Sequence, residues 1–321
     1  MSKALQEEVT RLFQEKKVEM VIGWEKGSLP MTATPVFIRK AEDAERLIWD
    51  ETCTNNLAVY LTKDKRQLTK TNQKIGIVVK GCDGRSLVLY AVENQIVREN
   101  LVIIGVPCQG VVDRNKVLKR TGGKEVTDVH FEKSQVIIEG SDFKLKMDRS
   151  DILSSSCLNC LHPNAPVHDV FIGEPQKTTT ETAVYQDVEA FEALDAETRW
   201  HSMVDAYSKC IRCYACRNVC PSCYCNECFV DQNSPQWIGK SPEITDTIIF
   251  HLIRNLHVAG RCVECGACER ACPAGIELLK LNRKISKEIM ERFSFTAGLD
   301  INEEPALASF CENEKQDFIM G

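Results

Sequence analysis

The chain has 321 residues, of which 43% are hydrophobic and 27% are charged, and its formal net charge is −6. This length and composition predict a globular protein with two domains of ordinary size. The acidic balance and the lack of a basic face interleaved with aromatic residues exclude nucleic acid as the main partner. No apolar stretch has the length needed to span a bilayer, so we expect no direct membrane insertion.

Cysteine is unusually abundant, with 17 copies. Residues 1–23 form a charged amphipathic segment without the apolar core of a signal peptide. We therefore expect a cytoplasmic protein whose thiols stay reduced and available to metals.

The first half of the chain predicts an α/β domain. Apolar residues recur at helical spacing over 2–17, extended pieces follow at 18–24 and 36–38, and a helix is predicted over 41–49. Two β-branched runs, Ile75–Val79 and Leu101–Val106, then flank a helix predicted over 86–95. This βαβ pattern is typical of a parallel sheet.

A cysteine follows each of these two strands, Cys82 after the first and Cys108 after the second. In an open α/β sheet, ligands bind beyond the carboxyl ends of the strands. A hairpin (126–131 and 135–139) and a third strand (143–147) lead into a CxxC turn, Cys157 to Cys160. The sequence therefore suggests a [4Fe-4S] cluster held by Cys82, Cys108, Cys157 and Cys160. A CxxC also suits zinc or a redox disulfide, and Cys82 and Cys108 could instead be buried free thiols.

Residues 174–186 are polar, rich in threonine and predict a linker. Beyond it, helices are predicted over 187–207, 244–258 and 276–292, followed by an acidic tail over 297–321. The predicted fold is thus a mixed α/β domain with a partly parallel sheet (1–173), joined to an all-α domain (187–296).

The α-helical part contains the pattern CxxCxxCxxxCP twice, ending at Pro221 and at Pro273. This is the ligand run of bacterial ferredoxins, in which the fourth cysteine binds the other cluster. We therefore assign one [4Fe-4S] cluster to Cys210, Cys213, Cys216 and Cys272. The second is assigned to Cys262, Cys265, Cys268 and Cys220. Zinc knuckles or disulfides would not require two identical runs of four.

Five cysteines remain outside these sets. Cys223, Cys225 and Cys228 follow the first motif as CxCxxC and could bind a further metal or pack beside the first cluster. Cys53 and Cys311 are expected to be structural or exposed thiols. His162 and His168 flank the CxxC turn and could donate hydrogen bonds near a cluster, whereas His251 and His257 are expected to be packed or surface residues.

These motifs resemble two families. Residues 187–292 resemble the α-helical ferredoxin domain of the heterodisulfide reductase C subunit and of the iron-sulfur subunits of succinate and anaerobic glycerol-phosphate dehydrogenases, at all eight cysteines. Residues 75–173, with Cys82, Cys108, the CxxC turn and the segment 169–173, resemble the beta subunits of coenzyme F420-dependent hydrogenases and formate dehydrogenases. The second resemblance implies a [4Fe-4S] cluster at those four cysteines and an FAD that exchanges electrons with a deazaflavin. The flavin site cannot be assigned to residues, and no GxGxxG or Walker loop is present.

Three classes of function fit these features. The first is an electron-transfer subunit that carries single electrons within an anaerobic oxidoreductase complex, with a heterodisulfide reductase-like flavoprotein, a hydrogenase or a formate dehydrogenase as partner. The second is a flavin-containing beta subunit that itself oxidises or reduces F420 or NAD(P)H. The third is a zinc-stabilised scaffold. The cluster cysteines would bind metal only, and no residue is assigned a catalytic role.

Overall fold

The computed structural model describes residues 1–62, 68, 73–132, 134–178, 184–241, 243–306 and 308. The amino-terminal half is built around a mixed sheet with the strand order β2-β1-β4-β5-β9, and β3 pairs with β1 at one end. Its strands are β1 (Met20–Lys26), β2 (Ala33–Ile38), β3 (Leu47–Ile48), β4 (Ile75–Val79), β5 (Leu101–Gly105) and β9 (Val170–Phe171).

The centre of this sheet is parallel. β4 pairs in parallel with β1, β5 pairs with β4 and β9 pairs with β5, whereas β2 and β3 run antiparallel to β1. All five residues of β4 are buried, as expected for a strand that is covered on both faces. The predicted α/β fold with a partly parallel sheet is confirmed.

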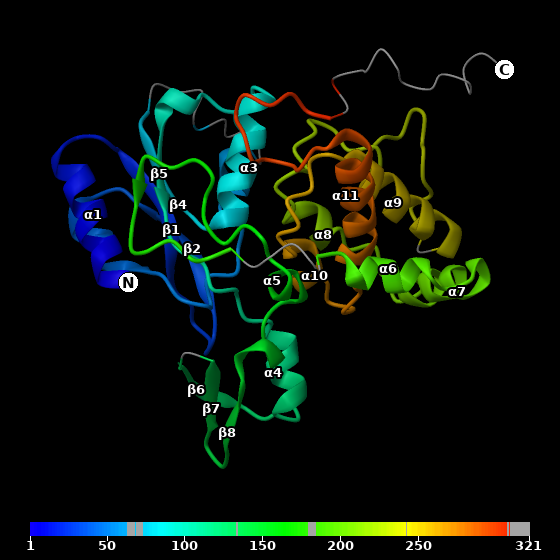
Figure 1. Cartoon of the computed structure of the whole chain (residues 1–321), viewed down its shortest axis with the longest axis horizontal. Helices are drawn as coiled ribbons and strands as arrows, with labels where there is room; N and C mark the ends of the chain where they lie inside the picture. Colours follow the sequence, from blue (N-terminus) through cyan, green and yellow to red (C-terminus); the bar gives the residue numbers. More distant parts are fainter. Residues whose placement is uncertain are drawn as a thin grey trace.

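Helices α1 (Ser2–Gln14) and α3 (Gly81–Val92) lie on opposite sides of the sheet (Figure 1). The buried face of α1 consists of Leu5, Val9 and Leu12. The helix predicted over 41–49 is instead a short 3-10 helix, Ala41–Arg46, followed by β3. Strand β3 pairs with Trp24 and Glu25 of β1, and this tertiary pairing ends the helix early.

Helix α3 begins five residues earlier than predicted, at Gly81 instead of Ser86. The Asp83 carboxylate accepts a hydrogen bond from the Lys80 backbone N–H (3.3 Å) and forms a buried ion pair with the Lys80 ammonium (2.9 Å). These contacts stabilise the first turn of the helix. Cys82 therefore lies within that turn and not in a loop.

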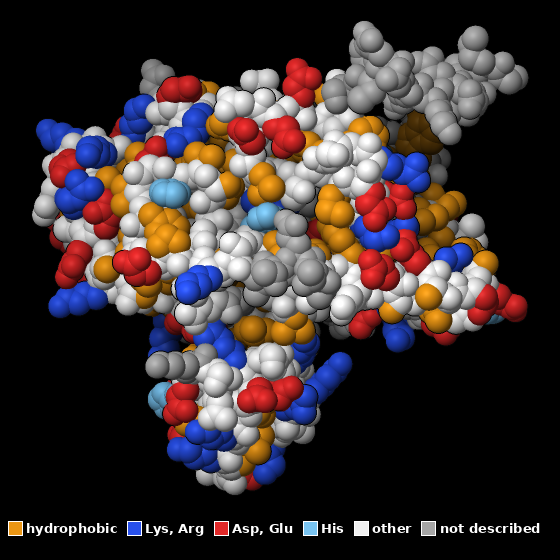
Figure 2. All heavy atoms as spheres, viewed as in Figure 1, with side chains coloured by type: hydrophobic (Ala, Val, Ile, Leu, Met, Phe, Trp, Pro, Cys, Tyr) orange, Lys and Arg blue, Asp and Glu red, His pale blue; other side chains and the backbone are white. Residues whose placement is uncertain are grey.

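A smaller antiparallel sheet projects from this body (Figures 1 and 2). It contains β6 (Val126–Phe131), β7 (Gln135–Gly140) and β8 (Lys144–Asp148), as predicted. Helix α4 (Arg114–Arg120), which was not predicted, supplies Val117 to the small core under this sheet. Figure 2 shows Lys, Arg, Asp and Glu side chains spread over the visible face of this lobe.

The carboxyl-terminal half is helical. Its described residues from 184 onward contain α6 (Gln186–Glu192), α7 (Ala196–Tyr207), α8 (Ala215–Asn218), α9 (Ile244–His257), α10 (Ala267–Arg270) and α11 (Leu279–Phe293), and no strand. The helix predicted over 187–207 is divided in two. The Asp195 side chain accepts a hydrogen bond from the Thr198 N–H (2.8 Å) and so caps a new helix.

Helix α3 joins the two halves. Leu87 and Tyr90 pack in the core of the sheet, while Leu89 packs with Val263 and Phe295 of the helical half. The Arg85 guanidinium donates hydrogen bonds to the carbonyl oxygens of Val263 (3.2 Å) and Ala297 (2.9 Å). Residues 83–90 of α3 are all buried, the polar ones included, because the helix lies between the sheet and the helical half.

The predicted linker and tail are described only in part. Residues 179–183 of the linker, and residues 307 and 309–321 of the tail with Cys311, lie outside the described residues. The first part of the tail packs against the body of the protein, with Ala297 and Ala306 in the same cluster as Leu89. Across the described part of the chain, every helix is too short or too polar to cross a membrane.

Candidate metal centres

The two CxxCxxC loops have the same backbone path. In both, the second and fourth residues after the first cysteine have positive φ: Arg212 (51°), Tyr214 (58°), Glu264 (54°) and Gly266 (69°). A short helix, α8 or α10, then begins one residue before the third cysteine. Non-glycine residues rarely adopt this conformation. Its repetition at matching positions indicates that both loops are shaped around the same kind of group.

The fourth cysteine of each motif lies beside the triplet of the other motif. Cys272 lines one small cavity together with Cys210, Cys213 and Cys216, and its thiol interacts electrostatically with that of Cys210. We call these four residues the first thiol group. Cys220 likewise interacts with Cys262, Cys265 and Cys268, and these four form the second thiol group. The structure thus brings together each set expected from the sequence, while the ligation itself remains a prediction.

The burial of the thiols suits the binding of a positively charged iron-sulfur core. Burial raises the pKa of the Cys268 thiol to about 12 and raises that of Cys262 well above its usual value. Without metal such thiols stay protonated, and iron binding would replace the protons. Backbone N–H groups point at the sulfurs, from Arg212 to Cys210 Sγ (3.4 Å) and from Ile276 to Cys272 Sγ (3.5 Å). Such donors stabilise thiolate-bound clusters and tune their potentials.

The arrangement of the thiols does not suit a single metal ion such as zinc. Within the described ranges, no three His, Cys, Asp or Glu side chains are grouped closely enough to hold one ion. In a cubane, each thiolate binds a different iron atom, so the sulfurs lie further apart.

The sequence interpretation missed one neighbour of the first thiol group, His251 on α9. Its Nε2 lies 3.3 Å from Cys210 Sγ, and its ring stacks on Tyr207 with centroids 4.3 Å apart. Burial lowers the pKa of His251 to about 4, so the ring is neutral at pH 7. A neutral imidazole with its proton on Nε2 would donate to the sulfur. Helical periodicity could place His251 on the buried face, but not beside a cysteine 41 residues away.

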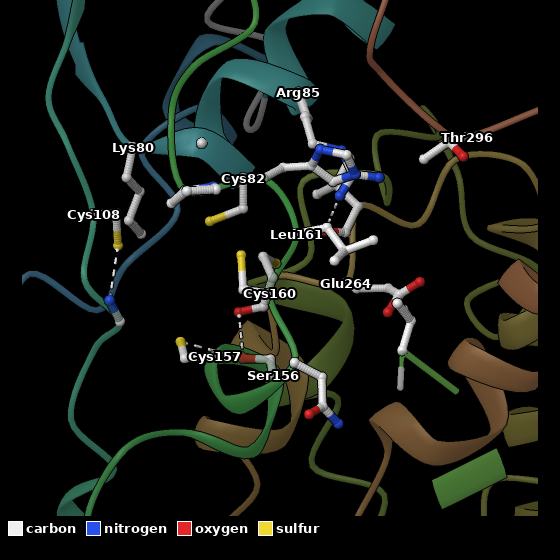
Figure 3. A pocket seen from close by; sticks show the side chains of 18 of the residues that line it. Lys80, Cys82, Arg85, Cys108, Ser156, Cys157, Cys160, Leu161, Glu264 and Thr296 are labelled. Carbon is white, nitrogen blue, oxygen red and sulfur yellow. Dashed lines mark hydrogen bonds between the residues drawn. The ribbon is translucent and has the colours of Figure 1, made fainter. Parts of the chain in front are cut away.

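The third thiol group consists of Cys82, Cys108, Cys157 and Cys160. Cys82 lies in the first turn of α3 and Cys108 in the loop after β5. Cys157 lies in helix α5 (Ser155–Leu158), and Cys160 follows that helix. Figure 3 shows their sulfur atoms facing a shared space, and all four line one cavity of about 580 Å³. Burial raises the pKa of Cys108 to about 12. Backbone N–H groups of Gly110 and Val111 donate to the sulfurs of Cys108 and Cys157, each at 3.4 Å.

The cavity extends beyond the thiols. Its wall includes apolar side chains and charged groups of both signs from both halves of the chain. The apolar residues are Leu161, Val184, Tyr185, Met290 and Leu299, the basic ones Arg85, His162, Lys177 and Lys287, and the acidic ones Glu189, Glu264 and Glu291. The volume lies in the range of small-molecule and cofactor sites, which are mostly apolar with a few polar groups.

The three thiol groups lie next to one another. Cys265 of the second group lines the same cavity as the third group and interacts electrostatically with Cys82. Cys216 of the first group interacts in the same way with Cys268 of the second. The spatial order is therefore third, second, first. Two hydrogen bonds join the second and third groups, because Ser156 donates to the Cys265 carbonyl oxygen (3.4 Å) and Arg270 donates to the Ser154 hydroxyl (3.0 Å).

Within the described part of the chain, the remaining candidates do not form a comparable group. Cys225 is exposed, Cys228 packs against the core of the helical half, and the Cys223 N–H donates to the Cys220 carbonyl oxygen (3.2 Å). Cys53 is fully buried. His168 packs against Phe171, away from the thiols, whereas His162 lines the cavity of the third group.

Comparison with known proteins identifies the class of protein. Residues 206–276 match the family model of the 4Fe-4S dicluster domain, and residues 72–195 match that of the coenzyme F420 hydrogenase/dehydrogenase beta subunit, C terminus. The chain is an iron-sulfur electron-transfer subunit of the oxidoreductase class. More particularly, it combines the F420 hydrogenase/dehydrogenase beta-subunit domain with a 4Fe-4S dicluster domain, as the sequence motifs predicted.

Two curated relatives span almost the whole chain. The F420-dependent formate dehydrogenase subunit beta of Methanocaldococcus jannaschii is 22% identical, over 91% of this chain and 91% of the relative. The F420-dependent formate dehydrogenase 1 subunit beta of Methanococcus maripaludis is 24% identical, over 92% and 90%. Among solved structures, a chain of the xenon-derivatized F420-reducing [NiFe] hydrogenase complex from Methanosarcina barkeri matches 65% of this chain and 86% of its own length, with 14% identity and a TM-score of 0.40.

Proposed function

We propose that the chain relays single electrons through three [4Fe-4S] clusters, one at each thiol group. The observation that carries this proposal is the spatial order of the groups. Cys265 of the second group interacts electrostatically with Cys82 of the third, and Cys216 of the first group interacts in the same way with Cys268 of the second. Clusters held in this order would form one path through the protein, because each exchanges one electron with its neighbour. The proposed path begins at the third group, beside the interface of the two domains, and continues into the helical domain of residues 187–296.

The two ends of the relay differ. At the third group, the cavity of about 580 Å³ offers space for an organic electron carrier. At the first group, Cys213 is exposed and the neighbouring Ile211 is 68% exposed, so the first cluster would lie close to the surface. A redox subunit of a larger complex could exchange electrons there. The F420-dependent formate dehydrogenases named above support formate oxidation or F420 reduction as the reaction of that complex. Such a relay requires a reducing compartment, for which we propose the cytoplasm.

A second candidate is a flavin-containing beta subunit that itself oxidises or reduces F420 or NAD(P)H. The cavity favours it, because the apolar wall formed by Leu161, Tyr185 and Met290 suits an isoalloxazine ring. A flavin there would convert two-electron transfer into the single-electron steps that the clusters require.

One experiment tests the relay and separates the two candidates. The full chain, purified without oxygen, is analysed for iron, sulfide and flavin and is then mixed with reduced methyl viologen and oxidised F420. The relay alone is expected to give about 12 iron atoms per chain, rapid cluster reduction and no loss of F420 absorbance. Bound flavin together with F420 reduction would establish the second candidate. A chain without iron and sulfide would contradict both.

A further inference from the structure

Arg254 on α9 is a buried cation without a carboxylate partner. Its side chain is 3% exposed, and Nη2 donates to the carbonyl oxygen of Cys216 (3.3 Å). Its Nε and Nη1 have no hydrogen-bond partner. Among the described residues, no carboxylate lies within ion-pairing distance of it. A guanidinium stays charged in proteins, so this arrangement buries an uncompensated positive charge.

Among the described residues, other buried cations such as Lys80 and Arg149 have a carboxylate partner: Lys80 pairs with Asp83 (2.9 Å), and Arg149 pairs with Glu51 (2.7 Å). The buried Arg85 and Arg212 have none in the described part of the chain, but two hydrogen bonds to oxygen atoms hold each of them, whereas Arg254 has one. A buried charge without a partner costs several kcal/mol, so it is expected only where some other negative charge lies nearby. For Arg254 the groups at hand are thiols, because it interacts electrostatically with Cys268 and Cys220 of the second group and with Cys216 of the first.

We infer that Arg254 is the shared counter-charge of the two clusters in the helical domain and raises the reduction potential of both. This inference rests on the proposed function, since it requires both clusters. A [4Fe-4S] cluster bound by four thiolates is negative and becomes more negative by one charge when it is reduced. A fixed cation between two such clusters stabilises the reduced state of each and weakens the repulsion between them. Arg254 would thus act on the clusters through its charge alone, as a positioning residue, and its side chain would touch neither substrate nor iron.

The test compares Arg254→Gln, Arg254→Lys and wild type as full-length chains in redox titrations followed by EPR, with iron and sulfide measured in each. For Arg254→Gln, we expect unchanged iron and a tenfold or larger loss in the one-electron reduction constant of both dicluster signals, a negative shift of at least about 59 mV. Arg254→Lys keeps the charge and is expected to stay within threefold of wild type. Arg149→Gln removes a buried arginine that is already paired and should leave both dicluster potentials unchanged.

Unchanged potentials in Arg254→Gln would overturn the inference. Equal shifts in Arg254→Gln and Arg254→Lys would also overturn it, because they would show that the hydrogen bond to Cys216 sets the potentials and the charge does not. If Arg254→Gln does not fold, Arg254→Met, which also removes the charge, replaces it in the same comparison with Arg254→Lys. Wild-type protein without two dicluster signals would instead refute the proposed clusters themselves.

Discussion

Replacing Cys220 and Cys262 together is expected to remove no more iron than replacing either one alone. Both belong to the second thiol group, although Cys220 comes from the first motif. With three cubanes, wild type should hold about 12 iron atoms, and each single alanine variant and this double variant about 8. Replacing Cys220 and Cys210 together should leave about 4, because these two residues serve different clusters. Iron and sulfide per chain, measured after anaerobic purification, provide the readout.

The exposed Cys225 supplies a matched control for this pairing test. It lies in the same stretch as Cys220 but outside the three thiol groups, so Cys225→Ala should keep about 12 iron atoms. The opposite pattern would show that each motif holds its own cluster. In that case the Cys220 and Cys210 double variant would match the single variants, and the Cys220 and Cys262 double variant would lose two clusters.

Cys82→Ala is expected to remove the third cluster and to leave the other two in place. Three thiolates remain at that site, too few to complete a cubane, and iron should fall from about 12 to about 8 atoms per chain. The EPR signals of the dicluster domain should persist, since Cys82 belongs to the other domain. Electron transfer from a carrier in the cavity to the dicluster should stop, because the cluster nearest that cavity is lost.

Cys53 provides the control for Cys82. It is a fully buried thiol of the same domain, and burial raises its pKa too, but it does not line the cavity of the third thiol group. Cys53→Ala should therefore retain all the iron. Full iron content in both Cys82→Ala and Cys108→Ala would rule out a third cluster and restore the interpretation of these residues as buried free thiols.

Much of the candidate site could be predicted because ligand spacing is a local property of the sequence. The two CxxCxxCxxxCP runs fix the loop geometry, and the rule that the fourth cysteine binds the other cluster predicts the side-by-side placement of Cys272 and Cys210. The third group could be predicted for a different reason. Parallel strands β4 and β5 end at the same edge of the sheet, so Cys82 and Cys108 must lie close together.

Other features depend on tertiary contacts and were not visible in the sequence. Helix α3 begins at Gly81 despite two glycines in its first turn, which disfavour helix. A Cβ at Gly81 would lie 1.8 Å from the His162 carbonyl oxygen, and one at Gly84 would lie 2.7 Å from the Ala165 side chain. The glycines therefore allow the 162–165 segment to pack against the helix. Arg254 could be placed on a buried helix face by periodicity, but its position between two thiol groups required the fold.

EPR spectroscopy of the fully reduced chain tests the central claim most directly. Clusters at the three thiol groups should be magnetically coupled, giving broad and split signals, because Cys265 interacts electrostatically with Cys82 and Cys216 with Cys268. In Cys82→Ala, the coupling to the third cluster should disappear while the coupling within the dicluster remains. A wild-type spectrum that is a simple sum of isolated clusters, or a chain that holds zinc in place of iron, would contradict the account.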